Sequence, residues 1–225
     1  MSLCIYASEL SACVGMNKYK SVEDAKMGVW RRWDTPSFRE ASERNLIAPH
    51  KTDEEMFAST TPSVQKLVST AVSSETEKAA TKIVERVIEN VRVKDLKEVS
   101  DSVVTVVNCR RGTQNEHKGI ASYENATRVK LHGKNLKFYK KCIGETSAGT
   151  KVCVGGRVDG LTNDKVVEVK SRRSRLFKTL PIYEKVQVQA YMFLTDKPVA
   201  EVVQKYDGMM RSDEHVADTE FWDAV

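Results

Sequence analysis

The spacing of apolar residues changes along the chain from a helical period to a strand-like one. Between residues 62 and 91 the apolar residues keep one helical phase, which predicts a long amphipathic helix, or two helices in register, packed on a core. Thr61 is expected to cap this helix and Pro62 to take its first position, where proline's missing N–H costs nothing. The apolar positions are Val64, Leu67, Val68, Ala71, Val72, Ala79, Ala80, Ile83, Val84, Val87, Ile88 and Val91.

Two segments precede this helical stretch. Residues 6–33 show the pattern of a helix, a loop at Gly15 and a second helix. Residues 34–61 are polar and contain Pro36 and Pro49, which predicts a long loop or short helices.

From Arg128 onward the pattern is that of strands separated by turns. The turn signals predict an antiparallel meander, followed by a helix over 181–195 and one more strand over 200–206. Strands between two helical regions predict a mixed α/β or α+β fold. The meander strands are expected at 129–131, 136–143, 152–154 and 166–170.

The chain length fits one globular domain. With 225 residues, of which 40% are apolar, the chain can bury roughly 70% of the surface it exposes when unfolded. We expect a single domain over 1–225, in which 1–127 is mainly helical, 128–207 holds the sheet and its helix, and 208–225 is an acidic tail.

The net charge of +5 is unevenly distributed. Residues 128–141 and 170–178 are strongly basic, whereas 212–225 contains acids and no Lys or Arg. A basic middle suggests a polyanion-binding face, although surface lysines kept for solubility would give a similar count.

Neither a membrane span nor a secretory signal is indicated. No run approaches the ~20 apolar residues that a bilayer requires, and the first ten residues lack the regions of a signal peptide. We expect an intracellular protein that is not secreted. The five cysteines include no C-x-x-C pair, so neither a disulfide framework nor a zinc site is indicated.

Candidate chemistry is concentrated between Asp159 and Lys170. Asp159 ends one predicted strand, while Glu168 and Lys170 lie two apart on the next and therefore share a face. Two carboxylates and an ammonium among valines are costly in a plain core but suit a hard cation such as Mg²⁺. Lys170 would then hold or deprotonate the attacking water. The alternative is a surface hairpin whose charges face solvent.

Four segments, in a fixed order along the chain, accompany Asp159, Glu168 and Lys170 as a set of motifs. They are Ala7-Ser8-Glu9; Arg111 to Glu116 followed by Tyr123-Glu124; Val158-Asp159-Gly160-Leu161 with Glu168-Val169-Lys170; and Gln187 to Met192. With these motifs the chain resembles the PD-(D/E)xK nuclease superfamily, and within it the lambda-exonuclease or viral-recombinase family. The resemblance implies a restriction-endonuclease-like core, a mixed central sheet of about five strands flanked by helices.

The resemblance also implies roles for individual residues. Asp159, Glu168, the main-chain carbonyl of Val169 and Glu116 would ligate Mg²⁺, with Mn²⁺ as a substitute, and Lys170 would be the catalytic lysine. Without the resemblance, Glu116 fits a solvated helix residue equally well. The DNA or phosphate contacts would be Ser8, Arg157, Arg172, Arg173, Gln187, Gln189 and Tyr191. Gln187 and Gln189 also fit surface glutamines, although Gln187 and Tyr191 are four apart and share a helix face.

The chain departs from the family pattern near Arg157. Val158 stands where the motif has proline, and the family's phosphate-binding arginine before the first motif is missing. Arg157 lies two residues before Asp159, so on a strand their side chains would share a face. Arg157 would then grip a phosphate or form a salt bridge to Asp159 or Glu116.

The leading hypothesis is a Mg²⁺-dependent exonuclease that digests linear duplex DNA, from the 5′ end as the resemblance implies, in viral or phage recombination, replication or repair. Alternatives are an endonuclease or single-strand nuclease on the same core, and a catalytically silent DNA-binding module. Expected partners are DNA, further copies of the chain in a ring, and a single-strand annealing protein. A viral source would place it in the host cytoplasm or nucleus.

Overall fold

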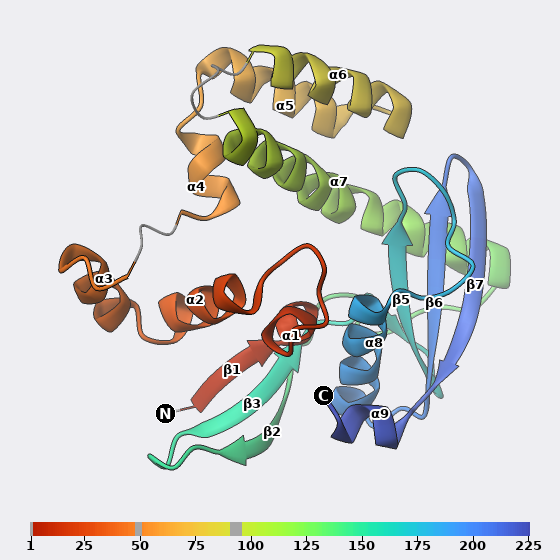
Figure 1. Ribbon diagram of the computed structural model, residues 1–225. Helices are drawn as coiled ribbons and strands as arrows, with labels where there is room; N and C mark the ends of the chain where they lie inside the picture. The colour runs from red at the N-terminus through yellow and green to blue at the C-terminus, as the bar shows by residue number, and fades with distance from the viewer. Residues whose placement is uncertain (1, 48–50, 91–95) are drawn as a thin grey trace.

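A computed structural model describes residues 2–47, 51–90 and 96–225. The fold is a mixture of helices and mixed β-sheets, so the α+β class predicted from the sequence is confirmed. Helices dominate the N-terminal half, and the strands from β2 onward follow helix α7 (Figure 1).

The helices in the described part of the chain begin and end as follows: α1 Ala7–Cys13, α2 Val22–Trp33, α3 Thr35–Glu43, α4 Asp53–Ala58, α5 Pro62–Ser73, α6 Glu77–Asn90, α7 Leu96–Thr127, α8 Ile182–Thr195 and α9 Thr219–Asp223. The strands are β1 Ser2–Tyr6, β2 Tyr139–Glu145, β3 Lys151–Gly156, β4 Gly160–Leu161, β5 Lys165–Ser171, β6 Val199–Tyr206 and β7 Met209–Val216. None of the described helices is long and apolar enough to cross a membrane.

The apolar pattern of 62–91 forms two helices rather than one. Helix α5 starts at Pro62 as predicted, with the Thr61 side chain accepting a hydrogen bond from the Val64 N–H, and it ends before α6 begins at Glu77. Their apolar faces pack with the first half of α7 around Val68, Val87 and Val103. Residues 34–61 contain the short helices α3 and α4; Pro49 and Val91 lie outside the described residues.

Helix α7 connects this helical cluster to the sheet. Val103 and Val106 in its first half face α5 and α6, while Ile120 and Tyr123 in its second half pack against Val167 and Val169 of β5. The sequence pattern does not predict this long helix, because its buried side chains serve a different partner in each half. Gly119 allows close packing: a Cβ there would collide with Val169 Cγ1.

The strands form two sheets, so the prediction of one central sheet of about five strands is wrong. The three-stranded sheet has the order β1-β3-β2, and the four-stranded sheet has the order β4-β5-β6-β7. The predicted antiparallel meander is right for β2 and β3, which pair antiparallel, and wrong beyond them, because β5 lies in the other sheet, where it pairs parallel with β6. The β5–β6 pair is connected through α8, a crossover of the kind that parallel strands require. The expected strand at 129–131 is absent; the one bridge described nearby joins His132 to Leu161.

The two faces of β5 have different neighbours. Val167 and Val169 face α7, whereas Val166 belongs to the core cluster that includes α8. Because side chains alternate along a strand, Glu168 and Lys170 lie on the α8 face with Val166. Helix α8 itself is confirmed as predicted and is largely buried.

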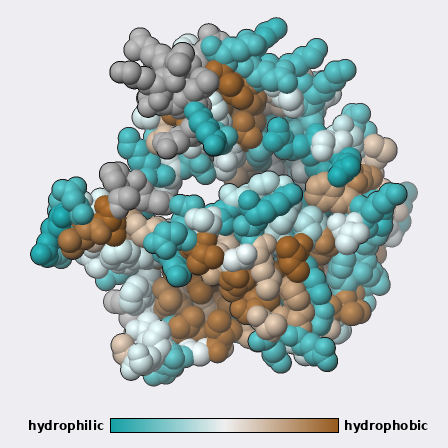
Figure 2. Space-filling model, viewed as in Figure 1, coloured by the Kyte–Doolittle hydropathy of each residue, from teal (hydrophilic) through white to brown (hydrophobic). Residues whose placement is uncertain are grey.

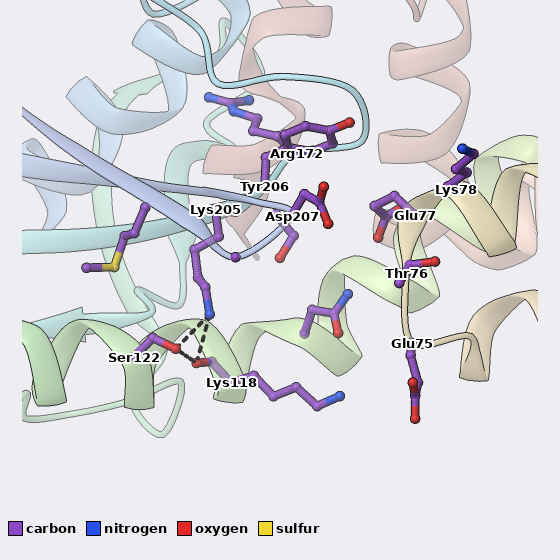
Figure 3. A pocket seen from close by; sticks show the side chains of 14 residues that line it. Glu75, Thr76, Glu77, Lys78, Lys118, Ser122, Arg172, Lys205, Tyr206 and Asp207 are labelled. Carbon is purple, nitrogen blue, oxygen red and sulfur yellow. Dashed lines mark hydrogen bonds between the residues drawn. The ribbon is translucent and has the colours of Figure 1, made fainter.

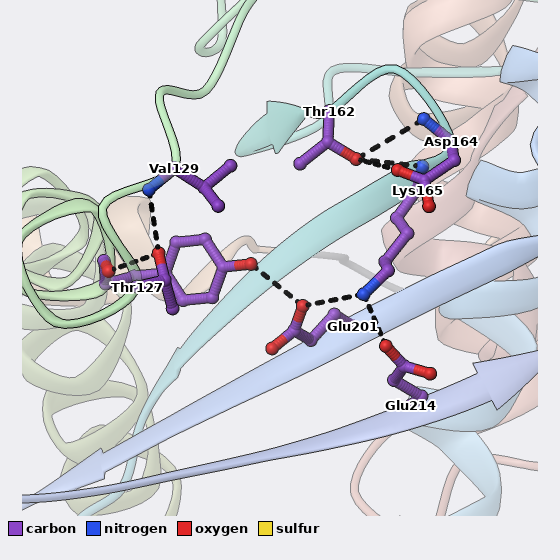
Figure 4. A network of polar contacts seen from close by, with 8 residues as sticks. Thr127, Val129, Thr162, Asp164, Lys165, Glu201 and Glu214 are labelled. Atoms are coloured by element: carbon purple, nitrogen blue, oxygen red, sulfur yellow. Dashed lines mark hydrogen bonds and ion pairs between the residues drawn. The ribbon is translucent and has the colours of Figure 1, made fainter.

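The last residues extend the larger sheet. Strand β7 pairs with β6 from Met209 to Val216, and α9 packs on α8 through Trp222, whose ring stacks on Phe193 with centroids 5.0 Å apart. At the start of β5, Lys165 forms ion pairs with Glu201 and Glu214, and the Tyr123 hydroxyl donates to Glu201 Oε2 at 2.8 Å (Figure 4). Tyr123 therefore stabilises the end of the sheet remote from Lys170.

Candidate active site

Asp159 is held against the middle of β5. Strand β3 ends at Gly156 and β4 begins at Gly160, so Asp159 lies in the link between them, with 8% of its surface exposed. The Val169 N–H donates to Asp159 Oδ2 at 2.7 Å. The structure thus brings Asp159 beside Glu168 and Lys170, as the sequence pattern predicted.

Lys170 is hydrogen-bonded on two sides. Its Nζ lies 2.7 Å from Glu168 Oε1 and donates to Gln187 Oε1 at 2.8 Å. The Gln187 amide nitrogen donates in turn to the Tyr191 hydroxyl at 3.0 Å. Gln187 and Tyr191, four residues apart on α8, therefore lie next to the lysine, and one hydrogen of its ammonium has no partner within the described part of the chain.

Glu116 approaches the same group from α7. Its Oε1 accepts a hydrogen bond from the side-chain amide of Asn135, and its carboxylate is close enough to influence Asp159. The main chain of Asn135 donates to the Val158 carbonyl at 3.0 Å, so Asn135 connects α7 to the link that carries Asp159. Asn135 has φ 52°, a conformation that asparagine tolerates better than most residues. The sequence motifs do not indicate Asn135 as a site residue, because its contacts with Glu116 and Val158 arise only in the folded chain.

The groups of the protein compensate the Asp159 and Glu168 carboxylates poorly. Burial, and next the neighbouring Glu116 carboxylate, raises the pKa of Asp159 to about 7. Burial, and next Asp159, raises the pKa of Glu168 to about 8. Glu168 is 4% exposed, and its Oε2 has no hydrogen-bond partner among the described residues. An unpartnered buried carboxylate oxygen is costly, which indicates that Glu168 Oε2 is suited to bind a group from outside the chain.

Lys170 keeps its charge in this setting. Burial lowers the pKa of Lys170, but the nearby carboxylates of Glu168, Glu184 and Asp159 outweigh this effect and leave the pKa above its ordinary value. The ammonium is therefore a fixed positive charge beside Glu168.

The donors fit a hard cation that keeps water ligands. Within the described ranges, no three His, Cys, Asp or Glu side chains form a ready-made metal cage. Glu168 turns one oxygen toward Lys170, so a cation here would be held by few protein oxygens. Mg²⁺ has this preference, since it takes oxygen ligands and usually retains several waters.

Ser8 lies beside the α8 end of the site. It is exposed in the first turn of α1. A Cβ added at Gly156 would lie 2.9 Å from the Tyr191 ring and 3.3 Å from Ala7 Cβ, so the start of α1 and Tyr191 meet over this glycine. In the described structure no hydrogen bond joins Ser8 to Gln187, and the two residues are linked only through the contact between Ala7 and Tyr191.

Two predicted DNA contacts are instead part of the interior. Arg172 is 7% exposed and forms a bidentate ion pair with Glu184. Gln189 is 4% exposed; its amide donates to the Val216 carbonyl and accepts from the Asp218 N–H. Because their polar groups already bind protein, we leave both residues out of the DNA surface.

Arg157 does not share a face with Asp159. The expectation assumed one continuous strand, but β3 ends at Gly156, so the alternation of side chains stops before Arg157. Arg157 is exposed and its guanidinium lies 5.6 Å from the centre of the Phe138 ring, while Asp159 is buried. The alternative of a salt bridge to Asp159 or Glu116 is likewise not among the described ion pairs. Arg173 is exposed and also has no acidic partner there.

A cavity of about 690 Å³ lies between α7, the start of α6 and the β6–β7 turn. Its lining carries both signs of charge, and Lys205 donates to Ser122 Oγ at 2.7 Å (Figure 3). Such a mixed lining does not favour a polyanion. Ser171, which lines it, alternates with Lys170 on β5, so this cavity lies on the other face of the strand from the candidate site.

Figure 2 shows the molecule hollowed between the α4–α7 helices and the part that contains α1, α2 and α8, with hydrophilic residues on both sides. Glu116 from α7 and Gln187 from α8 come from these two parts and meet around Asp159 and Lys170. The candidate site therefore joins the two parts of the fold.

No protein-family model and no curated protein matches the sequence. Among solved structures, a crystal structure of SSO0001 is similar with a TM-score of 0.44 and 12% identity, over 96% of this chain and 68% of that one. An alkaline exonuclease, LHK-Exo, from Laribacter hongkongensis is similar with a TM-score of 0.39 and 15% identity, over 76% of this chain and 86% of that one. Its complex with dAMP gives a TM-score of 0.39 and 14% identity, over 70% and 78% of the two chains. At such scores and identities these structures assign no family, and the functional argument depends on the residues of this chain.

Proposed function

We propose that the protein is a metal-dependent deoxyribonuclease that hydrolyses phosphodiester bonds at the Asp159–Glu168–Lys170 site. The observation that carries this proposal is a buried, incompletely paired set of two carboxylates and an ammonium. Glu168 Oε2 lacks a partner in the described structure, and Asp159 is buried beside a second carboxylate. This is the chemistry expected of a cation site that also contacts a phosphate.

Each residue has a distinct part in the proposed reaction. Asp159, Glu168 and the Val169 carbonyl would hold Mg²⁺, with Glu116 as a further carboxylate. Bound there, the cation supplies Lewis-acid polarisation of the scissile phosphate. Lys170 is oriented by Glu168 and Gln187, and the third hydrogen of its ammonium would be available to the attacking water or a phosphate oxygen. Asn135 and Tyr191 position Glu116 and Gln187.

DNA would be held by cations that the fold leaves unpaired. Among the described residues, Arg157, Arg173, Arg175 and Lys178 are exposed and form no ion pair with an acid. In the other basic segment, Lys134 pairs with Glu124 and Lys141 with Asp196, so that segment is partly used by the fold itself. Contacts to phosphate alone give binding that depends on salt and is independent of sequence.

We further propose exonuclease action on linear duplex DNA from the 5′ end, with Mn²⁺ able to replace Mg²⁺, in viral or phage recombination. A ring of identical chains and a single-strand annealing partner are proposals of the same kind. The resemblance of the sequence motifs supports these finer points. An endonuclease or single-strand nuclease on the same residues is the second candidate, since the three charged groups determine the cleavage chemistry and not the form of the DNA.

The test is digestion of a linear duplex labelled at either 5′ or 3′ end, beside a closed circle, in Mg²⁺, Mn²⁺, Ca²⁺ or EDTA. We expect Mg²⁺ and Mn²⁺ to support early release of the 5′ label and to leave the circle intact. Loss of the circle would favour the endonuclease. Full activity in excess EDTA would remove the metal site from the mechanism.

Metal binding can be measured separately from turnover. Mg²⁺ should raise the melting temperature of the wild-type protein, because binding to the folded state stabilises it. Asp159→Asn should reduce this increase, whereas Asp101→Asn, an exposed substitution on α7, should not. An equal increase in both variants would place the cation elsewhere.

A further inference from the structure

A second cavity, of about 550 Å³, lies between the loop that follows α1 and the segment that precedes α8. Its volume is in the range of small-ligand sites, roughly 300–1,000 Å³. We call it the Tyr19 cavity, after the residue on its rim. The residues that matter to the argument are Lys18, Tyr19, Arg175, Phe177, Lys178 and Tyr183.

The Tyr19 cavity is basic. Lys18, Arg175 and Lys178 are exposed, and no acidic residue lines the cavity. None of the three cations forms an ion pair with an acid in the part of the chain that the structure describes. The cavity of Figure 3 differs in this respect, since Glu75, Glu77 and Asp207 offset its cations. A concave surface that carries several cations and no acid attracts an anion such as a phosphate group.

An exposed aromatic ring stands beside these cations. Tyr19 is 74% exposed, yet its ring is held edge-to-face against Tyr183, with centroids 5.6 Å apart. Lys18 Nζ lies 4.8 Å from the centre of the Tyr19 ring. A held, solvent-facing aromatic ring beside cations is the combination that binds single-stranded nucleic acid, because bases stack on the ring while phosphates contact the charges.

The Tyr19 cavity is close to the candidate active site. Tyr183 and Gln187 are four residues apart on α8 and so lie one above the other on the same side of the helix. Gln187 accepts the hydrogen bond from Lys170. The cavity therefore begins about one helical turn, roughly 6 Å along the axis of α8, from Gln187. A strand whose phosphate is at Lys170 can place a neighbouring nucleotide at Tyr19.

We propose that the Tyr19 cavity is a subsite for unpaired nucleotides of the DNA strand, with a base stacked on Tyr19 and its phosphates held by Lys18, Arg175 and Lys178. This proposal rests on the proposed nuclease function and specifies the form of DNA at that site. Bases inside a duplex are covered on both faces by their neighbours, so stacking on Tyr19 requires a base that has left the helix. The subsite thus favours a single strand or a frayed end over intact duplex.

The test is equilibrium binding, in EDTA, of a fluorescein-labelled oligothymidine and of a blunt hairpin duplex with the same number of phosphates. Tyr19→Ala should weaken oligothymidine binding about 5- to 100-fold, as expected for loss of one base stack. Tyr19→Phe should bind like wild type because it keeps the ring. Arg175→Glu should weaken oligothymidine binding, whereas Lys66→Glu, an exposed charge reversal on α5 outside the cavity, should have a much smaller effect.

Each result decides the proposal. Unchanged oligothymidine binding by Tyr19→Ala would overturn it. Equal weakening of oligothymidine and hairpin binding by Tyr19→Ala would also overturn it, because the ring would then not distinguish unpaired bases from duplex. Since Tyr19 is exposed, we expect its substitution to leave the protein folded. Because binding is measured without turnover, the subsite proposal and the nuclease proposal can be rejected independently of each other. Ring-dependent binding without any DNA cleavage in Mg²⁺ would reject the nuclease function, whereas normal cleavage with ring-independent binding would reject only the subsite.

Discussion

Two buried ion pairs lie close together at the end of β5, and they differ in how completely their hydrogen-bonding groups are used. In the Arg172–Glu184 pair, Nη1 and Nη2 contact Oε1 and Oε2 at 2.5 and 2.8 Å, and Nε donates to Gln204 Oε1 at 2.8 Å. Gln204 also bonds both main-chain groups of Phe177. Every group is satisfied, and the pair fastens the basic segment to α8 and β6.

In the Lys170–Glu168 pair only Glu168 is fully buried, the Lys170 side chain being 20% exposed, and the pair is incomplete. Only one oxygen of Glu168 contacts Lys170, the other has no partner in the described structure, and Asp159 adds a second poorly compensated carboxylate. A buried ion pair whose hydrogen-bonding groups all have partners is consistent with a purely structural role. A buried pair with an unpartnered group is costly unless a ligand binds that group. The comparison therefore supports a structural role for Arg172 and the proposed catalytic role for Lys170.

The largest effect that separates the two pairs is expected at Lys170. Lys170→Ala should lower the rate of DNA cleavage on the order of 10³-fold, because it removes a charge aimed at the reacting phosphate. DNA affinity, measured in Ca²⁺, should change little because many other cations contact phosphate. Lys165→Ala, at the opposite end of the same strand, is the control. Turnover close to wild type in Lys170→Ala would contradict the assignment.

Arg172 should show the reverse behaviour. Arg172→Ala leaves Glu184 buried without its partner and should destabilise the protein by about 3 kcal/mol. Denaturant unfolding measures this loss, and the exposed neighbour Arg173→Ala should change stability little. Cleavage per folded Arg172→Ala molecule should fall far less than in Lys170→Ala. A large loss of cleavage by Arg172→Ala with unchanged stability would show that both ion pairs belong to the active site.

The pH dependence of stability in EDTA should show how much the buried, ionised Asp159 carboxylate destabilises the folded protein. Its folded-state pKa of about 7 exceeds the ordinary 3.8, so the folded protein binds an extra proton between these values. Stability therefore falls as pH rises through this window and levels off above it. Asp159→Asn lacks the ionisation and should be more stable than wild type at pH 8 by on the order of 2 kcal/mol, with the difference shrinking toward pH 4. Parallel pH profiles for the two proteins would show that Asp159 is well compensated.

The smallest effect is expected at Arg157. Because its guanidinium lies on exposed Phe138 rather than beside Asp159, it is available as a general phosphate contact. Arg157→Ala should slow digestion of 5′-phosphorylated and 5′-hydroxyl duplex alike, by about two- to threefold at low salt. A selective loss on the 5′-phosphorylated substrate would instead make Arg157 a reader of the terminal phosphate.

Several parts of the fold were predictable because their signals are local. The start of α5 at Pro62, the helix α8 and the strand β6 follow from capping, periodicity and turn residues over short stretches. The shared face of Glu168 and Lys170 needed only the two-residue period of a strand. Strand β1 was missed because its five residues acquire meaning only through parallel pairing with β3, which comes much later in the chain.

The site shows the same division between local and distant information. Along the sequence Lys170, Arg172, Arg173 and Arg175 form one basic run; the two-residue spacing links Lys170 to Glu168, but nothing local distinguishes the three arginines. Packing makes Lys170 the partner of Glu168, encloses Arg172 between Glu184 and Gln204, and leaves Arg173 and Arg175 in solvent. The alternation argument failed for Arg157 because the end of β3 at Gly156 is a tertiary fact.

The sequence by itself therefore determined the α+β class, helices with local signals such as α5 and α8, and the identity of the charged residues near Asp159, because each depends on neighbours within a few positions. Only the tertiary structure decided which of those charges are compensated. Asn135 reaches Glu116, and Gln187 reaches Lys170, from elements distant in sequence. Whether a buried charge is satisfied depends on groups brought close by the whole fold, and this is why the chemistry of the site could be suggested, but not assigned, from the order of residues.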